Sequence, residues 1–299
     1  MISAIQRQED GTIRLTVTVP FDAVKKTWDE VIEEVAKEIE VPGFRIGKAP
    51  RHLVEEKIDK EKVREEALKK LLPKFYIDAV QEHNLRPIIN PKIHIEKLED
   101  PQTLSESKGW QFTALTCESP EVKLNNYKQN IQKITAAATF DVAKSKIIVP
   151  GEPFDPSTPF RAKGRREVKL EDVVRALLES VSTTIPQVLI DQEVERLLAQ
   201  TLDDIKRLGL TLDQYLSSTN KTPEALRDEY KQKVINDLRL EFALQKIASD
   251  EKIMVNEKEI EEAIQKAKDE KERKHLEGNR YLLASILRQQ KTLDFLKNL

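Results

Sequence analysis

The strongest constraint on the fold is a set of long, highly charged segments in which apolar residues recur at helical spacing. In one of them an apolar side chain stands at every fourth position: Leu226, Tyr230, Val234, Leu238 and Phe242. This period places apolar side chains along one stripe of an α-helix and leaves its other faces to water. Charged residues make up 34% of the 299 residues, and only 8 are glycine. We therefore expect long amphipathic helices rather than a compact, glycine-rich enzyme fold.

Capping residues mark helix boundaries throughout the C-terminal half. Thr222 precedes Pro223, which is a strong helix start. Thr211 with Gln214, and Asn256 with Glu259, have capping-box spacing, and Gly209 suits a helix end. The charged run 266–274 is interpreted as a solvated helix face or tip. Residues 166–299 are thus predicted to form an all-α, elongated domain.

The N-terminal segment mixes the two periodicities. Apolar residues alternate with polar ones over 13–19, 93–95 and 110–114, which predicts strands. Helical spacing covers 21–40 and resumes near Pro50, continuing through Pro73 to a stop near Asn84. The order strand, helix, helix, strand, strand predicts an α+β domain over 1–117, with helices on one face of a small antiparallel sheet. Residues 118–165 contain five prolines and are predicted to be a mostly extended connector.

Several functional classes find no support in the sequence. No apolar run reaches membrane-spanning length, and the polar segment Met1–Asp10 lacks a secretory apolar core. The single cysteine, Cys117, favours a cytoplasmic setting and is interpreted as a small half-buried residue rather than a nucleophile. The four histidines lack metal-ligand spacing, and no nucleophile elbow or phosphate-binding loop occurs. We expect no catalytic residues, no cofactor and no metal.

The most distinctive segment is a basic island between the first two predicted helices. It reads VPGFRIGKAPR over 41–51, and Arg45, Lys48 and Arg51 give it three positive charges without an acidic residue. Gly43 and Gly47 would allow a tight loop that presents Phe44 and Arg45 to a partner. From residue chemistry alone, an ordinary helix–helix turn with Phe44 in the core explains the segment equally well.

The string GFRIGKAP resembles the GFRxGKxP signature of the trigger factor family, bacterial chaperones that bind the ribosome where nascent chains emerge. Further resemblances occur over most of 1–127 and 166–299, such as Pro120–Leu124 and the Ile185-Pro186 pair. The resemblance implies docking on the large ribosomal subunit near the exit tunnel, against ribosomal protein and rRNA. The implied docking residues are Gly43, Phe44, Arg45, Ile46, Gly47, Lys48 and Pro50.

The resemblance also implies the remaining properties of the chain. The helical domain would shield unfolded nascent polypeptides without ATP. The protein would act in the bacterial cytoplasm and would have no membrane partner. The resemblance also allows self-association through the helical domain. Ile46 replaces a residue that is usually basic in the family, which predicts weaker or more salt-tolerant docking. The family usually carries an FKBP-like isomerase domain of roughly a hundred residues. Since the connector is shorter, we expect neither that domain nor prolyl isomerase activity.

Three alternatives remain. A ribosome-independent holdase similar to SurA would use the same helical region. A nucleic-acid-binding or assembly factor would draw on the basic run 161–169, for which a solvated linker is the simpler interpretation. An isomerase enzyme would require turnover of a proline peptide.

Overall fold

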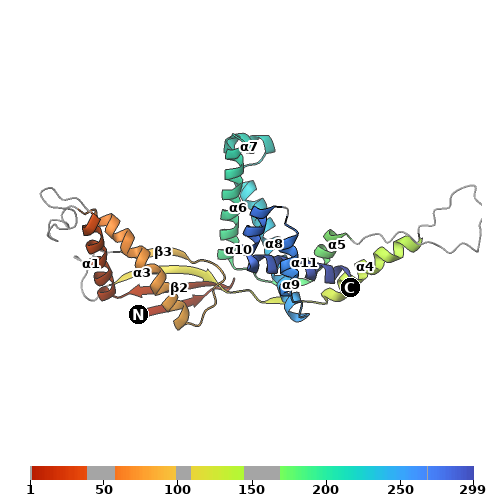
Figure 1. Ribbon diagram of the computed structural model, residues 1–299, viewed down its shortest axis with the longest axis horizontal. Coiled ribbons are helices and arrows are strands. Elements are labelled where there is room, and N and C mark those ends of the chain that lie inside the picture. The colour runs from red at the N-terminus through yellow and green to blue at the C-terminus, as the bar shows by residue number, and fades with distance from the viewer. Residues whose placement is uncertain (1, 39–57, 99–108, 145–168, 268) are drawn as a thin grey trace, which may run out of the picture. The chain divides into compact units, whose positions relative to one another are not determined.

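The computed structural model describes residues 2–38, 58–98, 109–144, 169–267 and 269–299 (Figure 1). The chain divides into two compact units. The N-terminal unit comprises Met1–Ser119 and Pro186–Glu193, and the C-terminal unit comprises Pro120–Ile185 and Val194–Leu299. No helix in these described ranges combines the length and apolar character that crossing a membrane requires.

The N-terminal unit is built on a four-stranded antiparallel sheet. Its order is β1-β2-β4-β3, and the strands are β1 (Ile2–Arg7), β2 (Thr12–Val19), β3 (Lys92–Lys97) and β4 (Trp110–Cys117). The predictions of β2, β3 and β4 are confirmed. The edge strand β1 was not predicted, because its residues from Ala4 to Arg7 are all exposed and show no apolar alternation.

Two helices, α1 (Phe21–Glu38) and α3 (Lys60–Glu82), pack on one face of this sheet (Figure 1). The alternating residues Ile13, Leu15 and Val17 on β2 are at most 1% exposed beneath them. Trp28 of α1 meets Trp110 of β4 edge to face, with ring centroids 6.4 Å apart. The predicted α+β arrangement of helices on one sheet face is confirmed.

Helix α3 begins and ends at residues with clear local roles. The Asp59 carboxylate accepts a hydrogen bond from the Glu61 N–H at 3.0 Å and caps the first turn. The helix continues through Pro73, as predicted. Just beyond its end, Asn84 has a φ of 52°, a left-handed conformation that stops the helix.

The C-terminal unit is largely helical. Its helices are α4 (Tyr127–Lys144), α5 (Leu170–Ser180), α6 (Gln187–Arg207, from Val194 onward), α7 (Leu212–Thr219), α8 (Pro223–Asp250), α9 (Glu257–Gln265), α10 (Glu270–Gly278) and α11 (Arg280–Lys297). A two-stranded pair, β5 (Val122–Leu124) with β6 (Val181–Thr183), was not predicted. The core brings together Ile131 of α4, Leu177 of α5, Ile247 of α8 and Leu296 of α11, all fully buried.

Local capping chemistry decides where these helices start. The Thr222 hydroxyl accepts from the Ala225 N–H at 3.2 Å, with Pro223 as the first helical residue of α8. Thr211 and Gln214 form a reciprocal capping box at the start of α7. These predicted helix starts are confirmed. Of the charged run 266–274, the residues from Glu270 onward lie in α10, which has no buried residue.

The prediction of a mostly extended connector over 118–165 is wrong for Tyr127–Lys144, which form helix α4. Tyr127 and Ile131 stand one turn apart and are buried in the C-terminal core, with Ile134 packed against it. The Tyr127 hydroxyl donates to Glu251 at 3.0 Å, and Lys128 pairs with the same carboxylate at 2.6 Å. This part of the connector therefore belongs to the C-terminal unit.

Candidate functional site

The predicted docking loop Gly43–Pro50 lies outside the described residues, as does nearly all of the basic run 161–169. Beyond the loop, the description resumes at Ile58. Ile58 is buried at 9% exposure in the N-terminal core, and Asp59 caps α3 directly after it. The first described residues after the loop therefore belong to the N-terminal core and to the start of α3.

The turn between α6 and α7 exposes three leucines, which we call the α6–α7 patch. Leu208, Leu210 and Leu212 are 74%, 42% and 39% exposed. Gly209 has a φ of 72°, and the Leu210 N–H donates to the Ile205 carbonyl at 3.1 Å, so the chain reverses sharply between the helices. The patch therefore spans the turn and the first residue of α7, Leu212.

A second exposed apolar surface lies on α11 and is called the α11 patch. Tyr281 is 91% exposed, Leu282 56% and Ile286 52%. Leu282 and Ile286 are four residues apart and share one side of the helix. Apolar groups gathered on a surface in this way are typical of sites that bind other apolar chains.

The loop after α8 presents Met254, whose side chain is 73% exposed. Two cations of α11 hold its backbone. Arg288 donates to the Ile253 carbonyl at 3.0 Å, and Lys291 donates to the Met254 carbonyl at 2.8 Å while pairing with Glu259. The backbone of Met254 is thus held in place, while its flexible thioether side chain stays exposed and can adapt to varied apolar partners.

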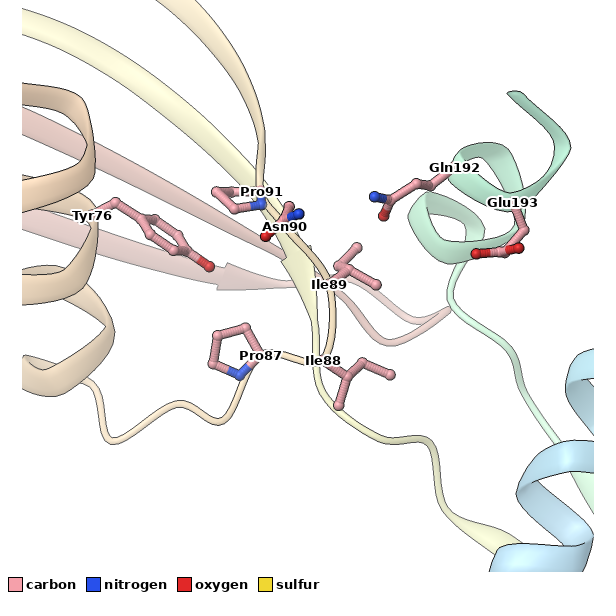
Figure 2. Close-up of a pocket in the computed structure, with 8 residues that line it drawn as sticks. All are labelled: Tyr76, Pro87, Ile88, Ile89, Asn90, Pro91, Gln192 and Glu193. Carbon is pink, nitrogen blue, oxygen red and sulfur yellow. The ribbon is translucent and has the colours of Figure 1, made fainter. Parts of the chain in front are cut away.

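The N-terminal unit contains a hollow of about 470 Å³, which we call the Tyr76 pocket (Figure 2). Three segments line it: α3, the loop between α3 and β3, and the start of α6. The lining residues are Tyr76, Pro87, Ile88, Ile89, Asn90, Pro91, Gln192 and Glu193. Figure 2 shows Tyr76 extending from α3 toward the loop, with Gln192 and Glu193 on the opposite side.

The start of α6 is attached to the N-terminal unit by a carboxylate. Asp10 accepts hydrogen bonds from the Gln187 N–H at 2.9 Å, the Thr12 N–H at 3.0 Å and the Thr12 hydroxyl at 2.7 Å. Partial burial favours the protonated acid, but these bonds outweigh it and lower the pKa of Asp10. At Gly11, with a φ of 87°, a Cβ would stand 3.3 Å from Pro186. This close fit fixes one wall of the Tyr76 pocket.

Candidate catalytic chemistry is sparse in the described part of the chain. Within it, no three histidine, cysteine or acidic side chains are grouped so that they could hold a metal ion. Cys117 is fully buried rather than half-buried. Burial, together with the negative charge of Asp10, raises the pKa of its thiol to about 11, so the thiolate that nucleophilic chemistry needs is scarce at neutral pH.

Sequence reasoning missed both apolar patches and the Tyr76 pocket. The leucines around Gly209 could have indicated an exposed patch, because apolar residues continue there beyond the predicted end of the helix. The pocket has no such indication, since its walls come from segments far apart in the sequence. For α11, the helical spacing of apolar residues does not show which of them are exposed and which are buried.

Two family models match the chain. "Bacterial trigger factor protein (TF)" matches residues 1–147, and "Bacterial trigger factor protein (TF) C-terminus" matches residues 162–298. A trigger factor of Nocardioides sp. is 35% identical over 127 residues, which are 42% of this chain and 26% of that protein. A Staphylococcus epidermidis trigger factor is 35% identical over 128 residues, covering 43% and 28%. The chain therefore spans little more than a quarter of the length of these curated relatives.

The fold has a counterpart among solved structures. A structure described as "Promiscuous Substrate Recognition in Folding and Assembly Activities of the Trigger Factor Chaperone" superposes with a TM-score of 0.63. The alignment covers 100% of this chain and 99% of the other, at 14% identity, and so concerns the fold alone. Because the two family models together cover nearly all of the sequence, the chain belongs to the trigger factor family.

Proposed function

We propose that the protein is an ATP-independent chaperone that docks on the bacterial ribosome near the polypeptide exit and shields nascent chains. The observation that carries the proposal is the match of both family models, one to each end of the chain. The GFRIGKAP string falls within the first matched region. Such a protein would work in the cytoplasm, where translation takes place.

Docking is assigned to the loop Gly43–Pro50. Phe44 would fill an apolar pocket, and Arg45 would pair with an rRNA phosphate or an acidic side chain of a ribosomal protein. Gly43 and Gly47 would shape the loop, Lys48 would add charge, and Pro50 would start the following segment. Ile46 contributes no charge, so the salt dependence of docking should be shallow.

The docking test is co-sedimentation of the full chain with ribosomes at low and high salt. Replacing Phe44, Arg45 and Ile46 with alanine should abolish co-sedimentation and leave the helical circular-dichroism signal unchanged. Lys74→Ala, which removes one charge from the exposed side of α3, is the matched control and should bind like the wild type. Unchanged binding of the triple variant would refute the docking assignment, and steeply salt-dependent binding to naked RNA would favour a nucleic-acid-binding protein instead.

Client binding is assigned to the α6–α7 and α11 patches. Each offers three apolar side chains to water, and their cover by an unfolded segment would release about 25 cal/mol per Å². Replacing Leu208, Leu210 and Leu212 with serine should weaken suppression of client aggregation by about tenfold. Ribosome co-sedimentation of this variant should not change, because the docking loop is intact. Equal suppression by variant and wild type would remove the patch from the proposal.

The proposal excludes prolyl isomerase activity. Only residues 148–161 separate the two matched regions, and domains usually need 50 residues or more. A proline-peptide isomerisation assay should give the uncatalysed rate at every protein concentration. A rate that rises with protein concentration would overturn this part.

A further inference from the structure

We propose that the Tyr76 pocket of the N-terminal unit is a binding site for an extended client segment, with an aliphatic side chain inserted among Pro87, Ile88 and Pro91. The inference rests on the proposed function, because that function supplies unfolded polypeptide as the ligand. It adds a client site apart from the patches of the C-terminal unit. All eight residues that line the pocket belong to the N-terminal unit.

Pro87, Ile88, Ile89 and Pro91 form the apolar part of a mixed pocket lining. Ile88 is 44% exposed, and its N–H donates to the Cys117 carbonyl at 3.0 Å. Just before it, the Arg86 N–H donates to Glu118 at 2.8 Å. Pro87 and Pro91 restrict the backbone on either side of this segment. A client side chain therefore meets a rigid apolar surface, which lowers the entropic cost of binding.

The polar groups of the pocket select a peptide. Asn90 and Gln192 face one another across the hollow (Figure 2), and a side-chain amide both donates and accepts, as a peptide bond does. Hydrogen bonds from these two amides to the peptide bonds of a client do not depend on the client's sequence. The apolar part of the lining favours aliphatic client side chains.

Charge argues against other classes of ligand. Among the eight described residues that line the pocket there is no lysine or arginine, and Glu193 contributes a carboxylate. A phosphate or carboxylate ligand would find no cation there. The volume of about 470 Å³ lies within the usual range of ligand sites.

Isoleucine methyl groups allow a direct test in the full chain. The probe is a capped peptide with consecutive leucine and valine residues between lysines, titrated into protein carrying ¹³C-labelled isoleucine δ1 methyls. We expect the signals of Ile88 and Ile89 to shift saturably. Ile77, which is 52% exposed on α3 but does not line the pocket, should not shift. A peptide with serine in place of leucine and valine should shift none of them.

Variants then separate the pocket from the rest of the protein. Asn90→Ala and Gln192→Ala should each weaken the Ile88 response by roughly two- to tenfold. Gln81→Ala, an exposed amide on α3 outside the pocket, should have no effect. Tryptophan fluorescence of the Trp28–Trp110 core checks that each variant folds.

The outcomes distinguish this inference from the proposed function. A shift of Ile286 on the α11 patch without any shift of Ile88 or Ile89 would overturn the pocket and leave the chaperone proposal standing. Equal shifts with the serine peptide would also overturn it. The absence of any isoleucine shift would count against both.

Discussion

Removing the Asp10 carboxylate should loosen the start of α6 from the N-terminal unit and destabilise that unit. In Asp10→Ala, the Gln187 N–H, the Thr12 N–H and the Thr12 hydroxyl all lose their acceptor. Hydrogen bonds to a charged group contribute about 1.5–3 kcal/mol when well shielded. Because Asp10 is only partly buried, water replaces part of each bond, so we expect a total loss of about 2–3 kcal/mol. Asp10→Asn keeps one acceptor oxygen and should lose about half as much.

The pH dependence of this loss has a definite sign. The folded-state pKa of Asp10 lies below its ordinary value of 3.8 because of the hydrogen bonds to Thr12 and Gln187, which outweigh burial. The stabilisation is therefore complete above the unfolded-state pKa and is lost as pH falls through the lower folded-state value. The difference between wild type and Asp10→Ala should be full at about pH 7 and smaller at about pH 3.

Urea unfolding followed by tryptophan fluorescence measures this difference in the relevant unit. Both tryptophans of the chain, Trp28 and Trp110, lie in the N-terminal core. Glu9→Ala removes the same charge from an exposed neighbour and should change the free energy of unfolding by less than about 0.5 kcal/mol. Equal unfolding of Asp10→Ala and Glu9→Ala, or a loss of stability in Asp10→Ala that is as large at low pH as at neutral pH, would refute the role of the Asp10 carboxylate.

Two further predictions concern the same unit. The Cys117 thiol, buried and with a pKa raised to about 11, should react slowly with alkylating reagents in the native protein and quickly in urea; fast native labelling would contradict its burial. Gly109→Ala should destabilise the sheet by several kcal/mol or prevent folding, since a Cβ would stand 1.9 Å from the Val19 carbonyl oxygen. The matched change Gly278→Ala meets nothing within 4 Å and should leave thermal unfolding nearly unchanged; similar losses in both variants would refute the steric argument.

The features predicted from the sequence are those that short segments encode by themselves. The starts of α7 and α8 follow from capping residues within one turn of each helix, such as Thr211 and Thr222. The family resemblance rests on a contiguous string, GFRIGKAP. In each case the informative residues are neighbours in sequence, so their chemistry is visible without the fold.

The missed features depend on contacts between distant segments. Helix α4 was not predicted because its apolar stripe is narrow, and Tyr127 and Ile131 are buried only by α5, α8 and α11. The Tyr76 pocket is lined by residues of both α3 and the start of α6. The start of α6 is held there by the hydrogen bond from the Gln187 N–H to Asp10. No local pattern could indicate that proximity.

The N-terminal unit is made of two segments that lie far apart in the sequence, and this affects how it folds during synthesis. This unit includes Pro186–Glu193, which the ribosome makes long after Ser119. The sheet and the helices α1 and α3 can assemble early, but the hydrogen bond from Gln187 to Asp10 and the Gln192 wall of the pocket cannot form until the later segment has emerged. The newly made unit therefore passes through an incomplete stage with an open end, and a fragment that stops at Ser119 would remain in that stage permanently.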